Sequence, residues 1–290
     1  MDLAPQVVAV IPTFHPTDHV RALVESLVAQ VAQVAHIVIS DDASPCTSDL
    51  LLREFSNSPG VTVLRHQRNA GVARGLNEGL AIAREQHAPW LLTIDQDSQV
   101  SRTYVQDLLN AAAQRLEFGE PLAAIGAAAI HDTSGPMTYP LRGEVSRPIT
   151  EELIQTGTLW RTDLLTESGG FDEELAMDAV DAAACLALRQ RGFTIGVAPG
   201  TSLEHSIGSA RVIHVLGRSI MITGHSPQRR TSMLRNRLRL FPAEFRQSPR
   251  HAIRTVRRVA INQTVGIATE RQRWSKARGS LRGLNPRSGR

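Results

Sequence analysis

The feature that most constrains this chain is a series of short apolar runs, each followed by a segment with helical periodicity. The runs Val7–Ile11, His36–Ser40 and Trp90–Ile94 have the length and β-branched content of buried strands. Strands that alternate with helices at this rhythm form βαβ units around a parallel sheet. We therefore predict an α/β protein whose Rossmann-like, mostly parallel sheet is flanked by helices.

The remaining elements follow the same alternation as far as the middle of the chain. The segment from His131 to Thr150 contains proline, glycine and charges without clear periodicity, and we expect a loop over the functional site there. Helices are predicted at about 18–28, 49–55, 69–85, 102–116 and 180–191, with further strands at 61–64, 123–130 and 194–198.

Composition restricts the class of protein. The chain has 290 residues with a hydrophobic fraction of 42%, and its apolar runs are shorter than the ~20 residues of a membrane-spanning helix. The N-terminal residues show no basic segment or cleavage pattern of a signal peptide. The two cysteines, Cys46 and Cys185, are far apart and form no disulfide framework. We expect a cytoplasmic protein.

The positive charge is concentrated at the C-terminus. From Arg246 onward there are twelve lysines and arginines against one acid, Glu270, so the rest of the chain is net acidic. The segment Arg250–Ala260 has the pattern of an amphipathic helix on an anionic membrane surface, with a solvated basic helix as the alternative. It lacks interleaved aromatic residues, so we expect no nucleic-acid partner. We place a domain at 1–245, with halves 1–100 and 101–245, and a basic helical extension at 246–290.

Acidic residues follow two of the predicted strands. Asp41 and Asp42 come after one, and Asp95 and Asp97 come after another. Strands of a parallel sheet end at one edge, where the ligands of such folds bind. Oxygen donors there suit a divalent cation, which in turn suits a diphosphate. The alternative is that these acids are ordinary turn residues.

A series of short motifs along the chain resembles those of the inverting glycosyltransferases of family 2, which have the GT-A fold. The resemblance spans about residues 6–245, and its last motifs are similar to those of the rhamnosyltransferase subgroup, which uses dTDP-L-rhamnose. The matching segments are Val10–Phe14, Ile39–Ser44, Asn69–Gly79, Asp95–Asp97, Ser168–Glu173, His205–Gly208, Leu216–Arg218 and His225–Arg230.

The resemblance implies a role for each matching polar residue of the N-terminal half. One of the acids after the second strand would accept the hydrogen bond of a pyrimidine N3–H group. The residues implied to bind the nucleotide are Pro12, Thr13, Asp41, Asp42, Asn69, Arg74 and Asp95, the last near the ribose or the water shell of the metal.

The resemblance also implies a metal site and a diphosphate site. Asp97 would be the direct ligand of Mn²⁺ or Mg²⁺, and His205 would complete the site. An imidazole ligand favours Mn²⁺ slightly. Arg229 and Arg230 would bind the diphosphate, since planar guanidinium groups suit paired oxygens.

Inversion requires a base that removes the proton of the attacking hydroxyl group. The family motif places this base at Asp181, with Asp178 as a second acid of the same segment, and a helix through both would put them on one face. The subgroup has an acid and an arginine where this chain has Ala183 and Ala187, which puts the acceptor contacts in doubt.

The resemblance thus implies a metal-dependent inverting glycosyltransferase that moves L-rhamnose from dTDP-L-rhamnose. The acceptor would be a glycan or a polyprenyl-linked saccharide of cell-surface polysaccharide synthesis, and the basic extension would contact the inner face of the membrane. Alternatives are another donor, such as a UDP-hexose or UDP-galactofuranose, or a catalytically impaired homologue that binds sugar nucleotides.

Overall fold

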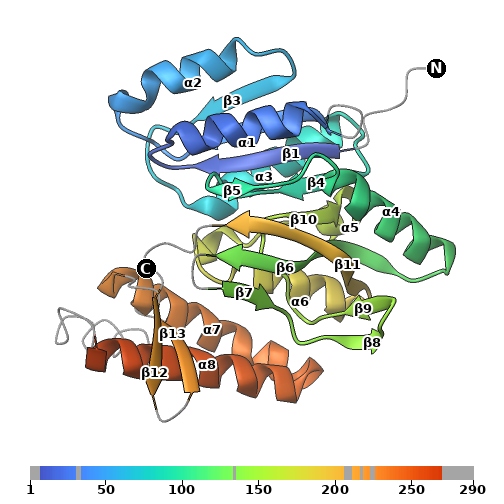
Figure 1. Cartoon of the computed structure of the whole chain (residues 1–290), viewed down its shortest axis with the longest axis vertical. Coiled ribbons are helices and arrows are strands. Elements are labelled where there is room, and N and C mark those ends of the chain that lie inside the picture. The colour runs from blue at the N-terminus through green and yellow to red at the C-terminus, as the bar shows by residue number, and fades with distance from the viewer. Residues whose placement is uncertain are drawn as a thin grey trace. The chain divides into compact units, whose positions relative to one another are not determined.

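A computed structural model describes residues 7–30, 34–132, 135–205, 211–215, 218–222 and 226–269 (Figure 1). Its contacts divide the chain into two compact units. Unit 1 consists of residues 1–131, 136–176 and 180–205, and unit 2 consists of residues 132–135, 177–179 and 206–290. The domain boundary proposed from the sequence, at residue 245, lies within helix α7 (Pro227–Gln247) of unit 2.

Unit 1 is built on a mixed sheet with a parallel N-terminal half. Strands β1 (Val7–Thr13), β2 (Val34–Asp41), β3 (Val61–Arg65) and β4 (Trp90–Thr93) are parallel to one another, in the order β3-β2-β1-β4. The order continues as β10-β6-β11-β9-β8, with β10 antiparallel to β4 and β6. The remaining strands are β5 (Ser98–Gln99), β6 (Leu122–Asp132), β7 (Gly135–Thr138), β8 (Arg142–Glu144), β9 (Arg147–Ile149), β10 (Thr158–Arg161) and β11 (Thr194–His205).

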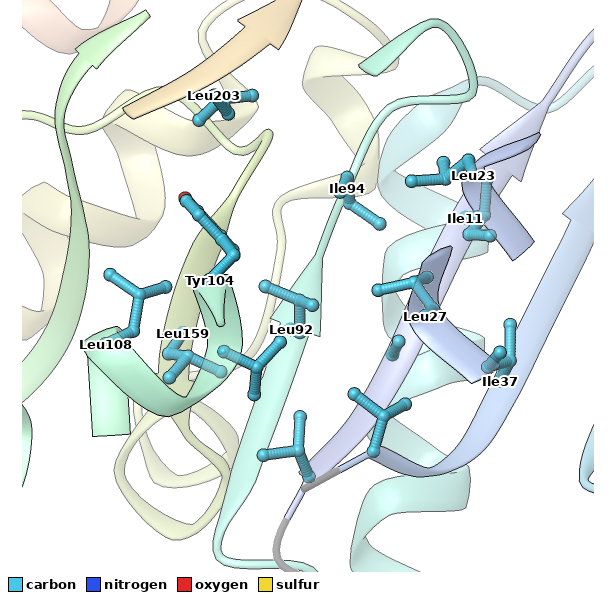
Figure 2. Packing of buried hydrophobic residues seen from close by; sticks show 14 of the residues in the cluster. Ile11, Leu23, Leu27, Ile37, Leu92, Ile94, Tyr104, Leu108, Leu159 and Leu203 are labelled. Atoms are coloured by element: carbon cyan, nitrogen blue, oxygen red, sulfur yellow. The ribbon is translucent and has the colours of Figure 1, made fainter. Parts of the chain in front are cut away.

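Helices cover both faces of this sheet, as the apolar runs of its central strands require. Side chains of β1 alternate between two hydrophobic clusters, one containing Val7, Ala9 and Ile11 and the other containing Val8 and Val10. The first cluster (Figure 2) includes residues of α1 (Asp18–Val28), α2 (Asp49–Ser56) and α4 (Tyr104–Glu117). The second includes residues of α3 (Val72–Glu85), α5 (Thr162–Glu167) and α6 (Val180–Gln190). The predicted α/β architecture is confirmed.

Two predictions for the middle of the chain are wrong. The expected loop at 131–150 contains the end of β6 and the short strands β7, β8 and β9. Short strands at or next to the edge of a sheet pair through backbone groups, so they do not need the apolar pattern by which strands are recognised in a sequence. The strand expected at 194–198 continues to His205 as β11, past an irregularity in its register between Ala198 and Ser202.

Unit 2 contains two long helices and a hairpin. Helix α7 (Pro227–Gln247) packs against α8 (Pro249–Thr269), and β12 (Arg211–Val215) pairs with β13 (Arg218–Ile222). Within the described residues, no helix has the length and apolar character needed to cross a membrane. The motif residues 206–208, 216–217 and 225 lie outside the described residues.

A glycine of α3 allows close packing between this helix and the central strand. A Cβ atom at Gly79 would lie 2.4 Å from Cβ of Val10. We predict that Gly79→Ala lowers the free energy of unfolding by ~1–3 kcal/mol, although alanine alone favours the helix by ~1 kcal/mol. Urea unfolding measures the change, with the exposed Glu85→Ala on the same helix as a control expected within ~0.5 kcal/mol. A stabilised Gly79→Ala variant would contradict the packing.

Candidate functional site

The site is centred on the turn that follows β4. The N–H group of Ile94 still donates to the carbonyl of Val10 at 3.1 Å, and the chain then leaves the sheet at Asp95. After the turn, β5 pairs antiparallel with the end of β11, which places Ser98 opposite His205. A histidine far along the sequence is therefore brought to the carboxyl edge of β4 by backbone pairing.

Three potential metal ligands meet at this edge. His205 Nδ1 lies 3.3 Å from Asp97 Oδ1, and His205 Nε2 lies 3.6 Å from Asp95 Oδ2. Among the described residues, these three side chains offer ligand atoms that all lie within 4.8 Å of one another. The two carboxylates and the imidazole form a donor set that fits Mn²⁺ or Mg²⁺. The structure thus brings Asp97 and His205 together, as the predicted site requires.

A second segment, residues 155–158, supports this turn, and sequence reasoning did not assign it a role. The N–H group of Asp95 donates to Thr156 Oγ1 at 3.0 Å, and Gln155 Nε2 donates to Asp95 Oδ1. Thr156 Oγ1 lies 2.6 Å from Ser98 Oγ, which lies 3.1 Å from His205 Nδ1. The signal that could have marked this segment is Gly157, whose φ of 73° and close approach to Tyr104 require a residue without a side chain.

The middle residue of the Asp-Gln-Asp motif joins the turn to the end of β1. Gln96 Nε2 donates to the carbonyl of Phe14 at 3.0 Å, and Gln96 Oε1 accepts from the N–H group of Phe14 at 3.1 Å. This pair of bonds holds the segment after β1, beside the predicted nucleotide residues Pro12 and Thr13, next to the turn after β4.

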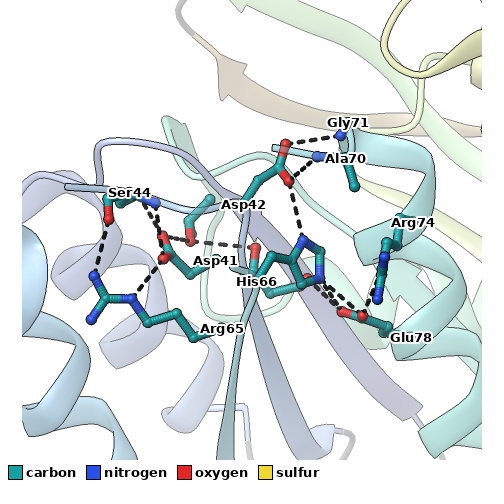
Figure 3. A network of polar contacts seen from close by, with 11 residues as sticks. Asp41, Asp42, Ser44, Arg65, His66, Ala70, Gly71, Arg74 and Glu78 are labelled. Atoms are coloured by element: carbon teal, nitrogen blue, oxygen red, sulfur yellow. Dashed lines mark hydrogen bonds and ion pairs between the residues drawn. The ribbon is translucent and has the colours of Figure 1, made fainter. Parts of the chain in front are cut away.

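Asp41, the last residue of β2, is fully buried and bonded within the protein (Figure 3). Its Oδ1 accepts from Ser44 Oγ, and its Oδ2 accepts from the N–H group of Ser44 at 3.2 Å and lies 3.4 Å from Arg65 Nε. Thr13 Oγ1 lies 3.5 Å from Oδ1. Asp41 therefore organises the loop after β2 from the inside.

The second acid, Asp42, is bound to the segment that precedes α3. Its Oδ1 accepts from the N–H group of Ala70 at 2.7 Å, and its Oδ2 accepts from the N–H group of Gly71 at 2.9 Å. His66 Nδ1 also lies 3.1 Å from Oδ1. Since a carboxylate oxygen has two acceptor positions, Oδ2 retains one beyond its bond to Gly71.

His66 connects Asp42 to α3, although the sequence alone did not single it out. Its Nε2 lies 2.9 Å from both carboxylate oxygens of Glu78, which also accepts from Ser40 Oγ at 2.8 Å (Figure 3). Burial lowers the pKa of His66, but its hydrogen bonds to Glu78 and Asp42 outweigh burial, and the net shift is upward. Arg74, a predicted nucleotide residue, is about half exposed and donates to Glu78 at 3.4 Å. Asn69 is exposed in the loop before α3.

The predicted base Asp181 lies in the first turn of α6, where its Oδ1 accepts from the N–H group of Ala182 at 2.8 Å. Tyr139, from the segment expected to be a loop, lies near it. Burial raises the pKa of Tyr139 well above its usual range, and the charge of Asp181 adds to the shift. The hydroxyl oxygen of Tyr139 accepts from the N–H group of Ile154 at 3.3 Å.

Asp178 does not share a helical face with Asp181. Helix α6 begins at Val180, and Ala179 before it has a φ of 66°. Asp178 is therefore not part of the helix that contains Asp181. Within unit 2, Asp178 Oδ1 lies 3.3 Å from Arg229 Nε, and its carbonyl accepts from Asn236 Nδ2 at 2.7 Å. Burial raises the pKa of Asp178, while the charge of Arg229 opposes the shift.

The two predicted diphosphate residues have different surroundings in unit 2. Arg229 is nearly half exposed. Arg230 is buried, and its Nη1 donates to the carbonyl of Asn262 and to Gln263 Oε1, both at 3.3 Å. Arg230 therefore joins α7 to α8, and its binding of a diphosphate stays a prediction.

Comparison with known proteins relates part of this chain to a family of enzymes. Residues 8–129 match the family described as glycosyl transferase family 2. Over 283 residues the chain is 25% identical to the dTDP-rhamnosyl transferase RfbF of Shigella flexneri, in a match that covers 91% of this chain and 89% of that protein.

Solved structures agree on the fold. The complex of S. aureus TarS 1–349 with UDP-GlcNAc has a TM-score of 0.64 at 15% identity, over 96% of this chain and 79% of TarS 1–349. GalNAc-T7 with UDP, GalNAc and Mn²⁺ has a TM-score of 0.61 at 13% identity, over 83% of this chain and 48% of that one. The fold is that of the GT-A glycosyltransferases, and the family 2 match extends over residues 8–129.

The network around His66 makes stability depend on pH. Because its pKa is raised in the folded state, its charged form stabilises the fold fully below its unfolded pKa of about 6.5, and this contribution is lost as pH rises through the folded value. We predict that His66→Gln lowers the free energy of unfolding by ~1–3 kcal/mol at pH 6 and by less at pH 9. Urea unfolding at both pH values measures this, and an equal or larger loss at pH 9 would contradict it. His36→Gln is the control, since burial lowers the pKa of His36.

Proposed function

We propose that this protein is a metal-dependent, inverting glycosyltransferase that transfers L-rhamnose from dTDP-L-rhamnose to a glycan or a polyprenyl-linked saccharide. The observation that carries the proposal is the meeting of Asp95, Asp97 and His205 at the carboxyl edge of β4, in a chain whose residues 8–129 match glycosyl transferase family 2. The donor is proposed from the match to RfbF, which extends over nearly the whole of both chains. Nucleotide-sugar binding is further supported by the UDP-GlcNAc complex of the similar TarS fold.

In this proposal, the edge formed by β1, β2 and β4 holds the nucleotide. Of the two acids after β2, Asp42 is the better partner for a pyrimidine N3–H group, because Asp41 is completely buried and Asp42 keeps an acceptor position on Oδ2. The exposed Asn69 and Arg74 would contact the ribose or phosphates from the start of α3. Asp95, Asp97 and His205 would hold Mn²⁺ or Mg²⁺, which would neutralise the charge of the diphosphate as it leaves.

Asp181 would act on the acceptor. Its carboxylate would take the proton of the acceptor hydroxyl as that oxygen attacks the anomeric carbon and the bond from this carbon to the diphosphate breaks. One displacement of this kind inverts the anomeric configuration. Tyr139, whose pKa is raised partly by the charge of Asp181, would line the acceptor side together with α6.

A second candidate function is a sugar-nucleotide-binding homologue with impaired catalysis. The observation that favours it is the pair Ala183 and Ala187 on α6, which stand where the rhamnosyltransferase motif has an acid and an arginine. The two candidates share donor binding and differ in transfer, so one set of measurements separates them.

The test is a thermal-shift screen of the full chain against dTDP-L-rhamnose, UDP-galactofuranose and UDP-hexoses, with and without Mn²⁺. We predict the largest rise in melting temperature with dTDP-L-rhamnose and Mn²⁺ together, since ligands that bind the native state stabilise it. Asp181→Asn should keep this shift and lower the rate of donor hydrolysis or transfer ~10²–10⁴-fold.

Each other outcome points to a different conclusion. A larger shift with a UDP-sugar would replace the donor. A shift that is independent of metal and unchanged in Asp97→Ala would contradict the metal site. Binding without turnover in the wild type would favour the impaired homologue.

We further propose that α8 contacts an anionic membrane surface. The helix carries Arg250, Arg254, Arg257 and Arg258 and no acidic residue. Ile253 and Ile261, which are 55% and 41% exposed, lie on the same side as these arginines at helical spacing. Exposed apolar side chains among cations suit a surface that offers both negative charge and hydrocarbon. Contact of the protein with a membrane would suit a polyprenyl-linked acceptor.

We predict that the full chain sediments with vesicles of phosphatidylcholine and phosphatidylglycerol, and much less with phosphatidylcholine alone. Ile253→Asp and Arg257→Glu should each weaken this binding, the latter by at least ~5-fold, since one cation contributes ~1 kcal/mol at such a surface. Leu50→Asp, at an 83% exposed position of α2 in unit 1, is the matched control. Equal binding by all three variants would contradict the proposed surface, and so would binding to nucleic acid in place of the vesicles.

A further inference from the structure

The residues at the carboxyl edge of β4 are held by a neighbouring segment that contributes no metal ligand itself. We call residues 155–158 the supporting segment; it directly precedes and opens β10. Thr156 and Ser98, which meet between this segment and the turn, are 2% and 0% exposed. Hydroxyl groups this deeply buried need defined hydrogen-bond partners.

The hydroxyl group of Thr156 lies between the backbone of Asp95 and the side chain of Ser98, which in turn contacts His205. A backbone N–H can only donate, so Thr156 Oγ1 accepts from Asp95. Its second lone pair can accept from Ser98 Oγ, 2.6 Å away, and Ser98 Oγ can then accept from His205 Nδ1, 3.1 Å away. In this order the ring proton is on Nδ1, and Nε2, on the side of Asp95, is the nitrogen that can bind a cation.

Gln155 orients the carboxylate group of Asp95. Its Nε2 donates to Asp95 Oδ1, so that Oδ2 is the oxygen on the side of His205, 3.6 Å from Nε2. Gln155 Oε1 is buried and has no hydrogen-bond donor among the described residues. Gln155 and Thr156, which are adjacent in the supporting segment, thus orient two proposed metal ligands, Asp95 and His205.

We propose that Thr156 and Gln155 are positioning residues that set Asp95 and His205 for binding of the divalent cation. The proposal rests on the metal-dependent function proposed above, and extends it to two residues outside the family motifs. Groups that orient metal ligands through their other hydrogen bonds change metal affinity by ~10–100-fold when they are removed.

A purely structural role for the segment is the alternative, and the chain provides a matched control. Thr158 belongs to the same segment and is 1% exposed, but its Oγ1 donates to the carbonyl of Ile154 at 2.7 Å and makes no hydrogen bond to the turn among the described residues. Thr156→Val and Thr158→Val both remove one buried hydroxyl at nearly constant volume. Thr156→Ser keeps the hydroxyl and removes only a methyl group.

The experiment measures Mn²⁺ binding to the full chain by calorimetry, without any sugar nucleotide, with unfolding free energies determined alongside. We expect Thr156→Val to weaken Mn²⁺ binding ~10–100-fold. Thr156→Ser should bind within a few-fold of the wild type, and Thr158→Val should bind as the wild type does even where its stability falls. Gln155→Ala should also weaken binding.

The outcomes separate this inference from the proposed function. Wild-type protein that binds no Mn²⁺ overturns the metal site, and the positioning role falls with it. Wild-type protein that binds Mn²⁺, with Asp97→Ala losing it, supports the site. The positioning role is then overturned if Thr156→Val binds as tightly as the wild type, or if Thr158→Val weakens binding equally.

Discussion

The pairing of β5 with the end of β11 is the interaction on which the candidate site depends. It consists of two register positions, Gln99 with Glu204 and Ser98 with His205, yet it joins the turn after β4 to a strand more than 100 residues later. Without it, Asp95 and Asp97 would be two acids in a turn, and His205 would be an isolated histidine. The pairing uses backbone groups to bring His205 to the turn, and the side chain of Ser98 in β5 then contacts its ring.

The two acids at the end of β2 are hydrogen-bonded within the protein. Asp41 and Asp42 follow the same strand, but one holds the loop after β2 and the other holds the segment before α3. His66 links Asp42 to Glu78 of α3. The acid proposed to face a nucleobase is therefore connected to α3 by hydrogen bonds. A network of this kind limits the movement of the edge, because every carboxylate in it is bonded to at least one rigid donor.

Arginines of unit 2 illustrate the difference between residue type and role. Arg229 and Arg230 are adjacent, and as a pair they resemble a site for paired phosphate oxygens. In the structure one is half exposed beside Asp178, and the other is buried between two helices, where it bonds to Gln263. A helix turns by about 100° per residue, so adjacent side chains point in different directions, and here the two arginines meet different surroundings. The same geometry separates Ile253 and the arginines of α8 from the residues that pack on α7.

The sequence by itself determined the α/β architecture, the helices and strands of the N-terminal half, and the acids at the ends of β2 and β4, because these depend on local periodicity and on residue type. It did not show that residues 131–150 contain strands, since edge strands need no apolar pattern. Only the tertiary structure decided that His205 lies beside Asp97, that Asp178 and Asp181 do not share a face, and that Thr156, Gln155 and His66 support the site. Those contacts join segments that are distant in sequence, and the hydrogen bonds that form them leave no periodic signal in the chain.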